Sequence, residues 1–321
     1  MGSRRYLVSK TLQAVVTLWF VLTFNFFLFR ILPGDPVAVL ARSEKLTPDD
    51  IARLQHELGL DRPMLQQYFV YMQQTLSGNL GESLTTTKEV KDMIGSRMLP
   101  TVVLVGFGTL FASYFGVVIG IRGGWRRGGR FDTTSQYGSL ILYSMPEGWL
   151  GMLLLLVFSG WLHWFPAGGY TTGGLTGTAR VVDIVDHLFL PLLTLTLGYI
   201  GGYAIVMRSS MIDTTHEDFV QTARAKGVPD RLVRKRHVVP NAFLPAFTLI
   251  FLSFGFVLGG AIVIETVFSW PGLGLLTYQA IQTLDFPVIQ GVFLIASAAV
   301  ILANLIADIT YGYLDPRIKQ A

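Results

Sequence analysis

The chain has 321 residues, of which 51% are hydrophobic and only 14% are charged, and its formal net charge is +4. A soluble domain carries about 25% charged residues, so lipid is the solvent for much of this chain. The sequence contains no cysteine, which excludes a disulfide framework and a thiolate metal site. The positive residues cluster beside apolar stretches, a pattern that fits membrane topology better than nucleic-acid binding.

Apolar stretches long enough to cross a bilayer recur along the chain. A spanning helix needs about 20 apolar residues, and this criterion predicts about six spans. In chain order the predicted spans are Thr11–Phe29, Met98–Ile121, Ser135–Leu162, Leu188–Met207, Val238–Ile264 and Phe286–Ala307. The first is too long for a signal peptide, and no small-residue cleavage site follows it, so we expect a retained helix. The sequence therefore predicts an all-α integral membrane protein.

The distribution of lysine and arginine predicts the orientation. The loops after the second and fourth spans are rich in both residues, whereas the loop after the third has only Arg180 and the loop after the fifth has none. Short cytoplasmic loops carry the positive excess. We therefore expect both termini in the cytoplasm and the segment 33–97 on the outer side.

The outer segment 33–97 has helical signals of its own. Thr47 is placed as a helix N-cap before Pro48, a second amphipathic stretch runs from Met64 to Leu76, and a third, around Val90, leads into the second span. This pattern indicates either a helical cap on the outer membrane surface or a docking surface for an external partner, and the two interpretations are compatible.

The loop after the fourth span contains a strongly delimited helix. Thr215 and Asp218 have the spacing of a capping box, Gly227 is placed to end the helix in a left-handed conformation, and Pro229 prevents its continuation. The sequence predicts a helix of about three turns with no apolar stripe of its own. We expect such a helix to need a partner.

This stretch, residues 216–229, reads HEDFVQTARAKGVP and resembles the EAA…G loop of bacterial ABC importer permeases. Glu217, Ala223 and Gly227 carry the resemblance. Asp218 and Phe219 stand where alanines are frequent, and this variant is similar to the peptide-importer branch. Other segments that resemble the B-type subunit of that branch are Leu32–Val37, Leu58–Pro63, Glu265–Gly274 and Leu314–Ile318. Together they extend over nearly the whole chain in the same order.

The resemblance implies a type I ABC importer permease fold in the bacterial plasma (inner) membrane. It divides the chain into a first helix within 1–32, the outer segment 33–97, a core at 98–314 that contains the coupling loop 208–240, and a tail at 315–321. The residues that it assigns to contact with the ATPase are Glu217, Asp218, Thr222, Ala223, Arg224, Ala225, Lys226 and Gly227.

The resemblance also implies a set of partners. They are a second homologous permease, two ATPase subunits or one fused ATPase, and an extracytoplasmic solute-binding protein that supplies the affinity for substrate. ATP and magnesium would be bound by the ATPases, with no cofactor on this chain. No phosphate-binding loop occurs in the sequence, and His216–Glu217 lacks the second histidine of a zinc motif. We therefore predict a transport subunit and not an enzyme, with no catalytic, cofactor-binding or metal residues.

Three further residues are candidates for the transport path. An ionisable group inside a span is costly and is by default a functional hypothesis. Glu147, beside Pro146 in the third span, either lines the path and attracts a cation such as a peptide ammonium, or bonds a neighbouring helix. Glu265 and Trp270 are candidates for an outer gate, in a turn that dips toward the pore. The alternative for Trp270 is an aromatic anchor at the membrane interface.

Small and charged residues in the spans predict packing contacts. The pairs Gly116/Gly120 and Gly255/Gly259 have the spacing of close helix–helix contacts. We expect Asp308, near the inner end of the last span, to pair locally with an arginine.

The resemblance implies that the function is import of dipeptides or oligopeptides driven by ATP. Nickel chelates, glutathione and oligosaccharides are alternative substrates within the same class, and the sequence does not decide among them. The alternative from another class is an autonomous secondary transporter, which would predict inverted repeats and paired broken helices. No convincing internal repeat is visible, and that class leaves the helix at 215–229 without a role. A membrane scaffold without transport is a third alternative, and it would not need Glu147 inside a span.

Overall fold

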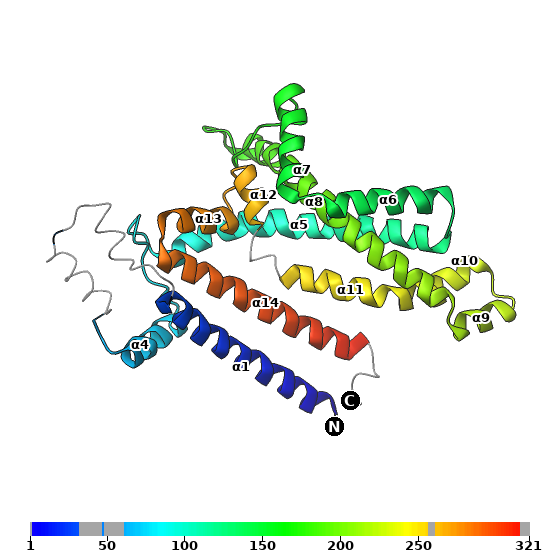
Figure 1. Cartoon of the computed structure of the whole chain (residues 1–321), viewed down its shortest axis with the longest axis horizontal. Coiled ribbons are helices and arrows are strands. Elements are labelled where there is room, and N and C mark those ends of the chain that lie inside the picture. Colours follow the sequence, from blue (N-terminus) through cyan, green and yellow to red (C-terminus); the bar gives the residue numbers. More distant parts are fainter. Residues whose placement is uncertain (1, 32–46, 48–60, 256–260, 315–321) are drawn as a thin grey trace. The chain divides into compact units, whose positions relative to one another are not determined.

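A computed structural model of the chain describes residues 2–31, 47, 61–255 and 261–314, and the regular elements of these residues are helices (Figure 1). Four of the described helices are long and apolar enough to cross a membrane, namely Tyr6–Arg30, Val90–Trp125, Gly177–Thr215 and Phe286–Thr310. A bent pair, Arg130–Ser144 with Glu147–Trp161, counts as a fifth span if it crosses. The prediction of an all-α membrane fold is confirmed.

The third predicted span is broken near its middle, as its sequence indicates. Helix α6 (Arg130–Ser144) ends, and helix α7 (Glu147–Leu154) begins after a bend of 101°. Pro146 causes the break, because its ring disfavours helical backbone at Met145, which has φ −75° and ψ 130°. The π-helix η1 (Leu155–Trp161) continues α7.

The fifth predicted span, Val238–Ile264, is described only in part. Its described portions are α11 (Val239–Gly255) and the start of α12 (Ile262–Val267). The pair Gly255/Gly259, the helix start at Thr47 and the tail at 315–321 involve residues outside the described ranges, as do the motifs Leu32–Val37 and Leu58–Pro63. The amphipathic stretch at Met64–Leu76 is confirmed as α4 (Met64–Leu76).

The chain divides into two compact units, of which the first comprises Met1–Leu99, Leu258–Ile262 and Gly272–Ala321. In it, α1 (Gly2–Ile31) packs along α14 (Phe286–Leu314) (Figure 1). The ammonium of Lys10 on α1 lies 3.0 Å from the carboxylate of Asp308 on α14. The prediction that Asp308 pairs with an arginine is therefore wrong, because the neighbouring helix α1 presents a lysine at this level.

A buried carboxylate fixes the connection between α13 (Leu273–Thr283) and α14 in the same unit. Asp285 is 2% exposed. Its carboxylate accepts hydrogen bonds from the hydroxyls of Ser83, at 2.5 Å, and Thr85, at 2.9 Å. The loop before α5 (Val90–Trp125) is thereby held to the α13–α14 turn, beside an apolar core formed by α5, α13 and α14.

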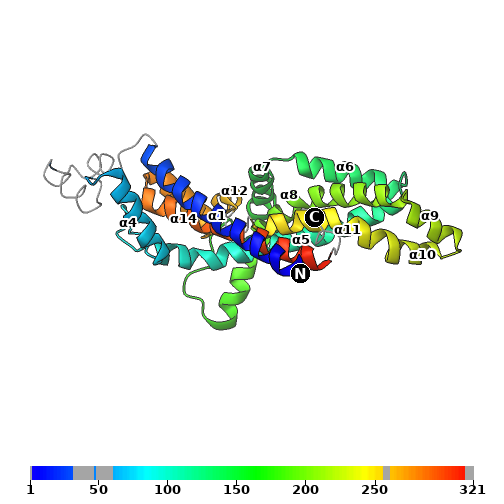
Figure 2. The same ribbon diagram turned by 90° about the horizontal axis from the view of Figure 1, so that it is seen from below.

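The second unit comprises Pro100–Val257 and Val263–Pro271, and α8 (Gly177–Thr215) is its central helix. Helix α8 packs against α6, α7 and α11, and both views draw α6 alongside it (Figures 1 and 2). Helix α5 also approaches α8 closely. A Cβ added at Gly120 would lie 2.6 Å from the Cβ of Met207 and 2.7 Å from the carbonyl oxygen of Ala204. The Gly116/Gly120 pair is thus confirmed as a helix–helix contact.

Candidate coupling site

The predicted loop helix is α9 (Asp218–Ala225), about two turns long. Its N-cap is Glu217, and the predicted capping box at Thr215 does not form. The reason is that α8 continues through Thr215, whose hydroxyl donates to the carbonyl of Ile212 at 2.7 Å. The prediction of a three-turn helix that starts at Thr215 is wrong at its N-terminal end. Thr215 belongs to the preceding helix α8, and α9 begins only at Asp218.

The C-terminal end of α9 is the one that the sequence predicts. Gly227 has φ +76°, a left-handed conformation that favours glycine. Its N–H donates to the carbonyl of Arg224 at 2.9 Å, and the N–H of Val228 donates to the carbonyl of Ala223 at 3.2 Å. These two bonds form a Schellman motif. The motif fixes where the chain leaves α9.

One face of α9 is apolar and buried against its own chain. Val220 is 0% and Ala223 is 6% exposed, and their spacing of three residues places them on one side of the helix. They pack in a cluster with Met207 and Met211 of α8 and with side chains of η2 (Val233–Val238) and α11. The prediction that α9 lacks an apolar stripe is therefore wrong. The chain itself sets the orientation of α9.

The opposite side of α9 is exposed. The exposed residues of this surface, called here the outer face of α9, are Glu217, Asp218, Phe219, Gln221, Thr222, Ala225 and Lys226. Phe219, which is 42% exposed, was not among the residues predicted to act in coupling. A large aromatic residue on a short polar helix between two spans is the signal that would have found it.

Two of the predicted coupling residues contact other parts of the chain. Ala223 is buried in the cluster described above. The guanidinium of Arg224 lies 3.4 Å from the carboxylate of Asp230 on α10 (Asp230–Leu232) and 5.8 Å from the ring centroid of Trp125. Arg234 of η2 lies over the same ring at 5.9 Å. These contacts hold the loop to the end of α5.

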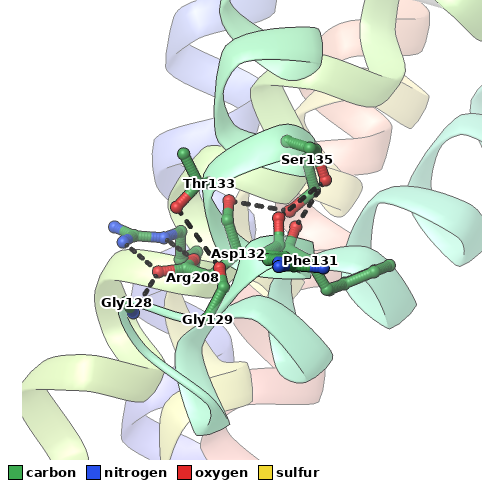
Figure 3. A network of polar contacts seen from close by, with 9 residues as sticks. Gly128, Gly129, Phe131, Asp132, Thr133, Ser135 and Arg208 are labelled. Carbon is green, nitrogen blue, oxygen red and sulfur yellow. Dashed lines mark hydrogen bonds and ion pairs between the residues drawn. The ribbon is translucent and has the colours of Figure 1, made fainter.

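A buried ion pair lies two turns before the end of α8 (Figure 3). The carboxylate of Asp132, a residue 2% exposed, accepts bonds from Arg208 Nε at 2.6 Å and Nη2 at 2.9 Å. The backbone N–H of Gly128 donates to the same carboxylate at 2.9 Å. The pair fixes the start of α6 against α8. Sequence reasoning missed it, because the two residues are 76 positions apart and no local spacing relates them.

Glu147 is the first residue of α7 and is partly buried. Its side chain lies against α8, where a Cβ added at Gly198 would lie 3.5 Å from Glu147 Cγ. The predicted bond to a neighbouring helix and the predicted role of Glu147 in a transport path both stay predictions.

Glu265 and Trp270 come together in a fully buried turn. Both are 0% exposed. Glu265 Oε1 accepts a bond from the hydroxyl of Thr101 at 2.9 Å, and Trp270 Nε1 donates to the carbonyl of Pro100 at 3.0 Å. The alternative of an interface anchor is wrong for Trp270, because this indole is enclosed by the protein. Their role as an outer gate stays a prediction.

Two family models match the chain, and together they cover most of it. The model of the binding-protein-dependent transport system inner membrane component matches residues 112–320. The model of the N-terminal part of the same component matches residues 3–105.

Individual relatives match over almost their whole length. A Brucella suis chain that is named provisionally as a peptide permease protein is 39% identical over 98% of this chain and 99% of its own. A di/tripeptide transport system permease of Pseudomonas aeruginosa and a glutathione transport system permease of Salmonella choleraesuis are each 37% identical, over 98% of both chains. The chain therefore belongs to the family of binding-protein-dependent transport system inner membrane components.

Proposed function

We propose that this chain is one transmembrane subunit of an ATP-driven peptide importer and that the outer face of α9 is the surface on which an ATPase docks. The observation that carries the proposal is the construction of α9. Val220 and Ala223 are buried and anchor this short helix to the rest of the chain, and the Schellman motif at Gly227 ends it. Its other side is exposed. A surface held in this way moves with the helices behind it.

The proposed mechanism follows from that anchoring. The sequence has no phosphate-binding loop, so a separate polypeptide must hydrolyse ATP. When the ATPases close on ATP, a docked α9 is displaced, and its apolar contacts with α8, η2 and α11 transmit the displacement into the membrane. The permease then alternates between inward-facing and outward-facing states, because ATP binding favours one of the two.

The proposed assembly contains a second homologous permease, two ATPase subunits or one fused ATPase, and an extracytoplasmic solute-binding protein. ATP and magnesium are bound by the ATPases in this proposal. The contacts to the ATPase come from Glu217, Asp218, Thr222, Ala225 and Lys226 together with Phe219. Arg224, Ala223 and Gly227 act by holding α9 in place.

Peptides are the proposed cargo, since a di/tripeptide permease and a dipeptide permease of Escherichia coli are similar to this chain at 37% and 36% identity. A glutathione permease is similar to the same degree, so glutathione is the competing substrate. Glu147 is the proposed attraction point for a cationic group in the path. Glu265 and Trp270 are the proposed parts of the outer gate.

The first test is to purify the chain in mild detergent with its genomic neighbours and to reconstitute what co-purifies. The proposal predicts that an ATPase and a second permease co-purify and that dipeptides, presented by the binding protein, stimulate ATP hydrolysis. Stimulation by glutathione alone would replace the substrate and keep the importer. Transport by this chain alone without ATP would overturn the proposal in favour of a secondary transporter.

A second test addresses the docking surface itself. Phe219→Ala is expected to weaken retention of the ATPase by about tenfold or more, because truncating a central aromatic side chain costs about 2 kcal/mol at an interface hot spot. Leu232→Ala, at an apolar residue 36% exposed on α10, is the matched control and is expected to retain the ATPase. Equal retention by the two variants would place the docking surface elsewhere.

A further inference from the structure

The inner end of α5 contacts the coupling loop at two places. Trp125 is the last residue of α5. The guanidinium groups of Arg224, in α9, and Arg234, in η2, lie 5.8 and 5.9 Å from its ring centroid. Trp125 also packs against the apolar cluster that contains Val220 and Ala223. Guanidinium groups over an indole face are held by electrostatic attraction to the ring. Trp125 therefore contacts both sides of the loop that bears α9.

The same helix contacts the buried outer turn at the beginning of its portion in the second unit. Thr101 donates its hydroxyl hydrogen bond to Glu265 at 2.9 Å, and the carbonyl of Pro100 accepts the indole N–H of Trp270 at 3.0 Å. All four residues are in the same unit as α9. The turn is fully buried at Glu265 and Trp270, so it cannot move independently of α5 without losing these bonds.

The stretch of α5 between these contacts is one continuous helix that packs tightly on α8. It runs from Thr101 to Trp125, about 36 Å at 1.5 Å per residue, and contains no proline after Pro100. Its backbone is packed tightly on α8, because a Cβ at Gly116 or Gly120 would lie 2.6 Å from the Cβ of Tyr203 or Met207. Closely packed helices transmit displacement instead of absorbing it.

We propose that α5 carries the displacement of the coupling loop to the Glu265–Trp270 turn, with Trp125 as the positioning residue at the inner end and Thr101 at the outer end. This inference rests on the proposed function, since it needs an ATPase that displaces α9. It adds a defined route, in which one helix joins the docking surface to the buried turn. The covalent link from α8 to α9 is a second, parallel connection.

The test uses the complete complex, reconstituted with its ATPases and binding protein, and measures peptide transported per ATP hydrolysed. Trp125→Leu keeps an apolar side chain in the cluster but removes the aromatic face, and Trp125→Phe restores that face. Thr101→Val removes the hydroxyl that donates to Glu265. Ser113→Ala is the matched control, because it removes a buried hydroxyl of α5 whose bond, to the carbonyl of Leu110 at 3.0 Å, stays within the helix.

Trp125→Leu and Thr101→Val are each expected to lower the transport-to-hydrolysis ratio about fivefold or more, in the range typical of coupling between sites. Trp125→Phe and Ser113→Ala should keep the ratio of the unmodified complex. The double variant Trp125→Leu/Thr101→Val should be no worse than the poorer single variant, because both substitutions interrupt the same connection. A loss of stability alone would lower the amount of complex without changing this ratio.

Two outcomes would overturn the inference. One is an unchanged ratio in Trp125→Leu, and the other is a double variant whose loss is the product of the two single losses, as independent sites would give. The behaviour of the unmodified complex distinguishes failure of this inference from failure of the proposed function. If the unmodified complex shows no peptide-stimulated hydrolysis, the importer proposal itself fails. If the unmodified complex is coupled and the variants keep its transport-to-hydrolysis ratio, only the proposed role of α5 is disproved.

Discussion

The Asp132–Arg208 pair is a buried ion pair of the second unit. The Asp132 side chain is 3% exposed and that of Arg208 is 21% exposed, and the guanidinium binds both carboxylate oxygens. Removing one partner of such a pair leaves an uncompensated charge out of water, which is costly. The pair therefore holds α6 on α8, and this stabilisation requires both residues.

We predict that Asp132→Asn lowers the stability of the purified complex by about 3 kcal/mol, the lower end for breaking a buried pair, because Arg208 is in part accessible to solvent. The measurement is thermal or denaturant unfolding. Asp230→Asn is the control, because Asp230 is also paired with an arginine but its side chain is 72% exposed, and exposed pairs contribute little. Equal effects of the two substitutions would contradict the interpretation of a buried pair.

At the residue scale, the sequence predicts those features that local geometry decides. The position of Gly227 before Pro229 predicts a left-handed helix end, and its φ of +76° confirms this. The partners of Asp308 and Asp132 were not predictable, because each is chosen by helix packing between residues far apart in the chain. Which cation lies opposite a carboxylate depends on the register of two helices, and the sequence does not state that register.

At the scale of elements, the end of α9 should matter more than its start. The Schellman motif at Gly227 fixes the C-terminal end of α9, whereas its N-cap, Glu217, makes no side-chain capping bond. An alanine at Gly227 would have to adopt φ +76°, which costs about 1–2 kcal/mol for a residue with a Cβ. We predict that Gly227→Ala lowers peptide transport and weakens ATPase retention, while Gly227→Asn is milder, because asparagine tolerates this conformation.

Gly174→Ala provides the comparison for that prediction. Gly174 has φ +85° in an exposed loop of the same unit, far along the chain from α9, and a Cβ there would meet no atom within 4 Å. The backbone strain is similar, so both substitutions should cost similar stability. Only Gly227→Ala should reduce ATPase retention, and an equal reduction in both would mean that strain anywhere in the unit impairs the complex.

The helices themselves were predicted more reliably than their ends. The break at Pro146 and the helix at Met64–Leu76 are predictable from the sequence, because proline and amphipathic spacing act locally. The extension of α8 to Thr215 and the burial of Val220 and Ala223 were not. Both depend on the tertiary packing of α8, η2 and α11. This packing provides apolar partners for residues whose neighbours in the sequence are polar.

At the scale of the whole molecule, the number of crossings is the property that connects fold to function. With α9 in the cytoplasm, both termini are on that side only if the bent pair α6–α7–η1 crosses the membrane. A bend of 101° is also compatible with a re-entrant loop. The lysine and arginine distribution predicts a crossing, because the loop before α6 carries Arg126 and Arg127, whereas the loop between η1 and α8 contains no lysine or arginine.

Single cysteines decide this point directly, because the natural chain has none and needs no cysteine-free background. Thr133→Cys lies at the exposed start of α6, and Gly173→Cys lies in the exposed loop after η1. A membrane-impermeant maleimide applied to cells with a permeable outer envelope but an intact inner membrane is expected to label Gly173→Cys alone. After the inner membrane is permeabilised, both should react. Only the bent pair separates the two positions, so labelling of both in intact cells would show that the pair is a re-entrant loop. Labelling of Thr133→Cys alone would mean that the orientation is inverted. In that case α9 would be out of reach of an ATPase that uses cytoplasmic ATP.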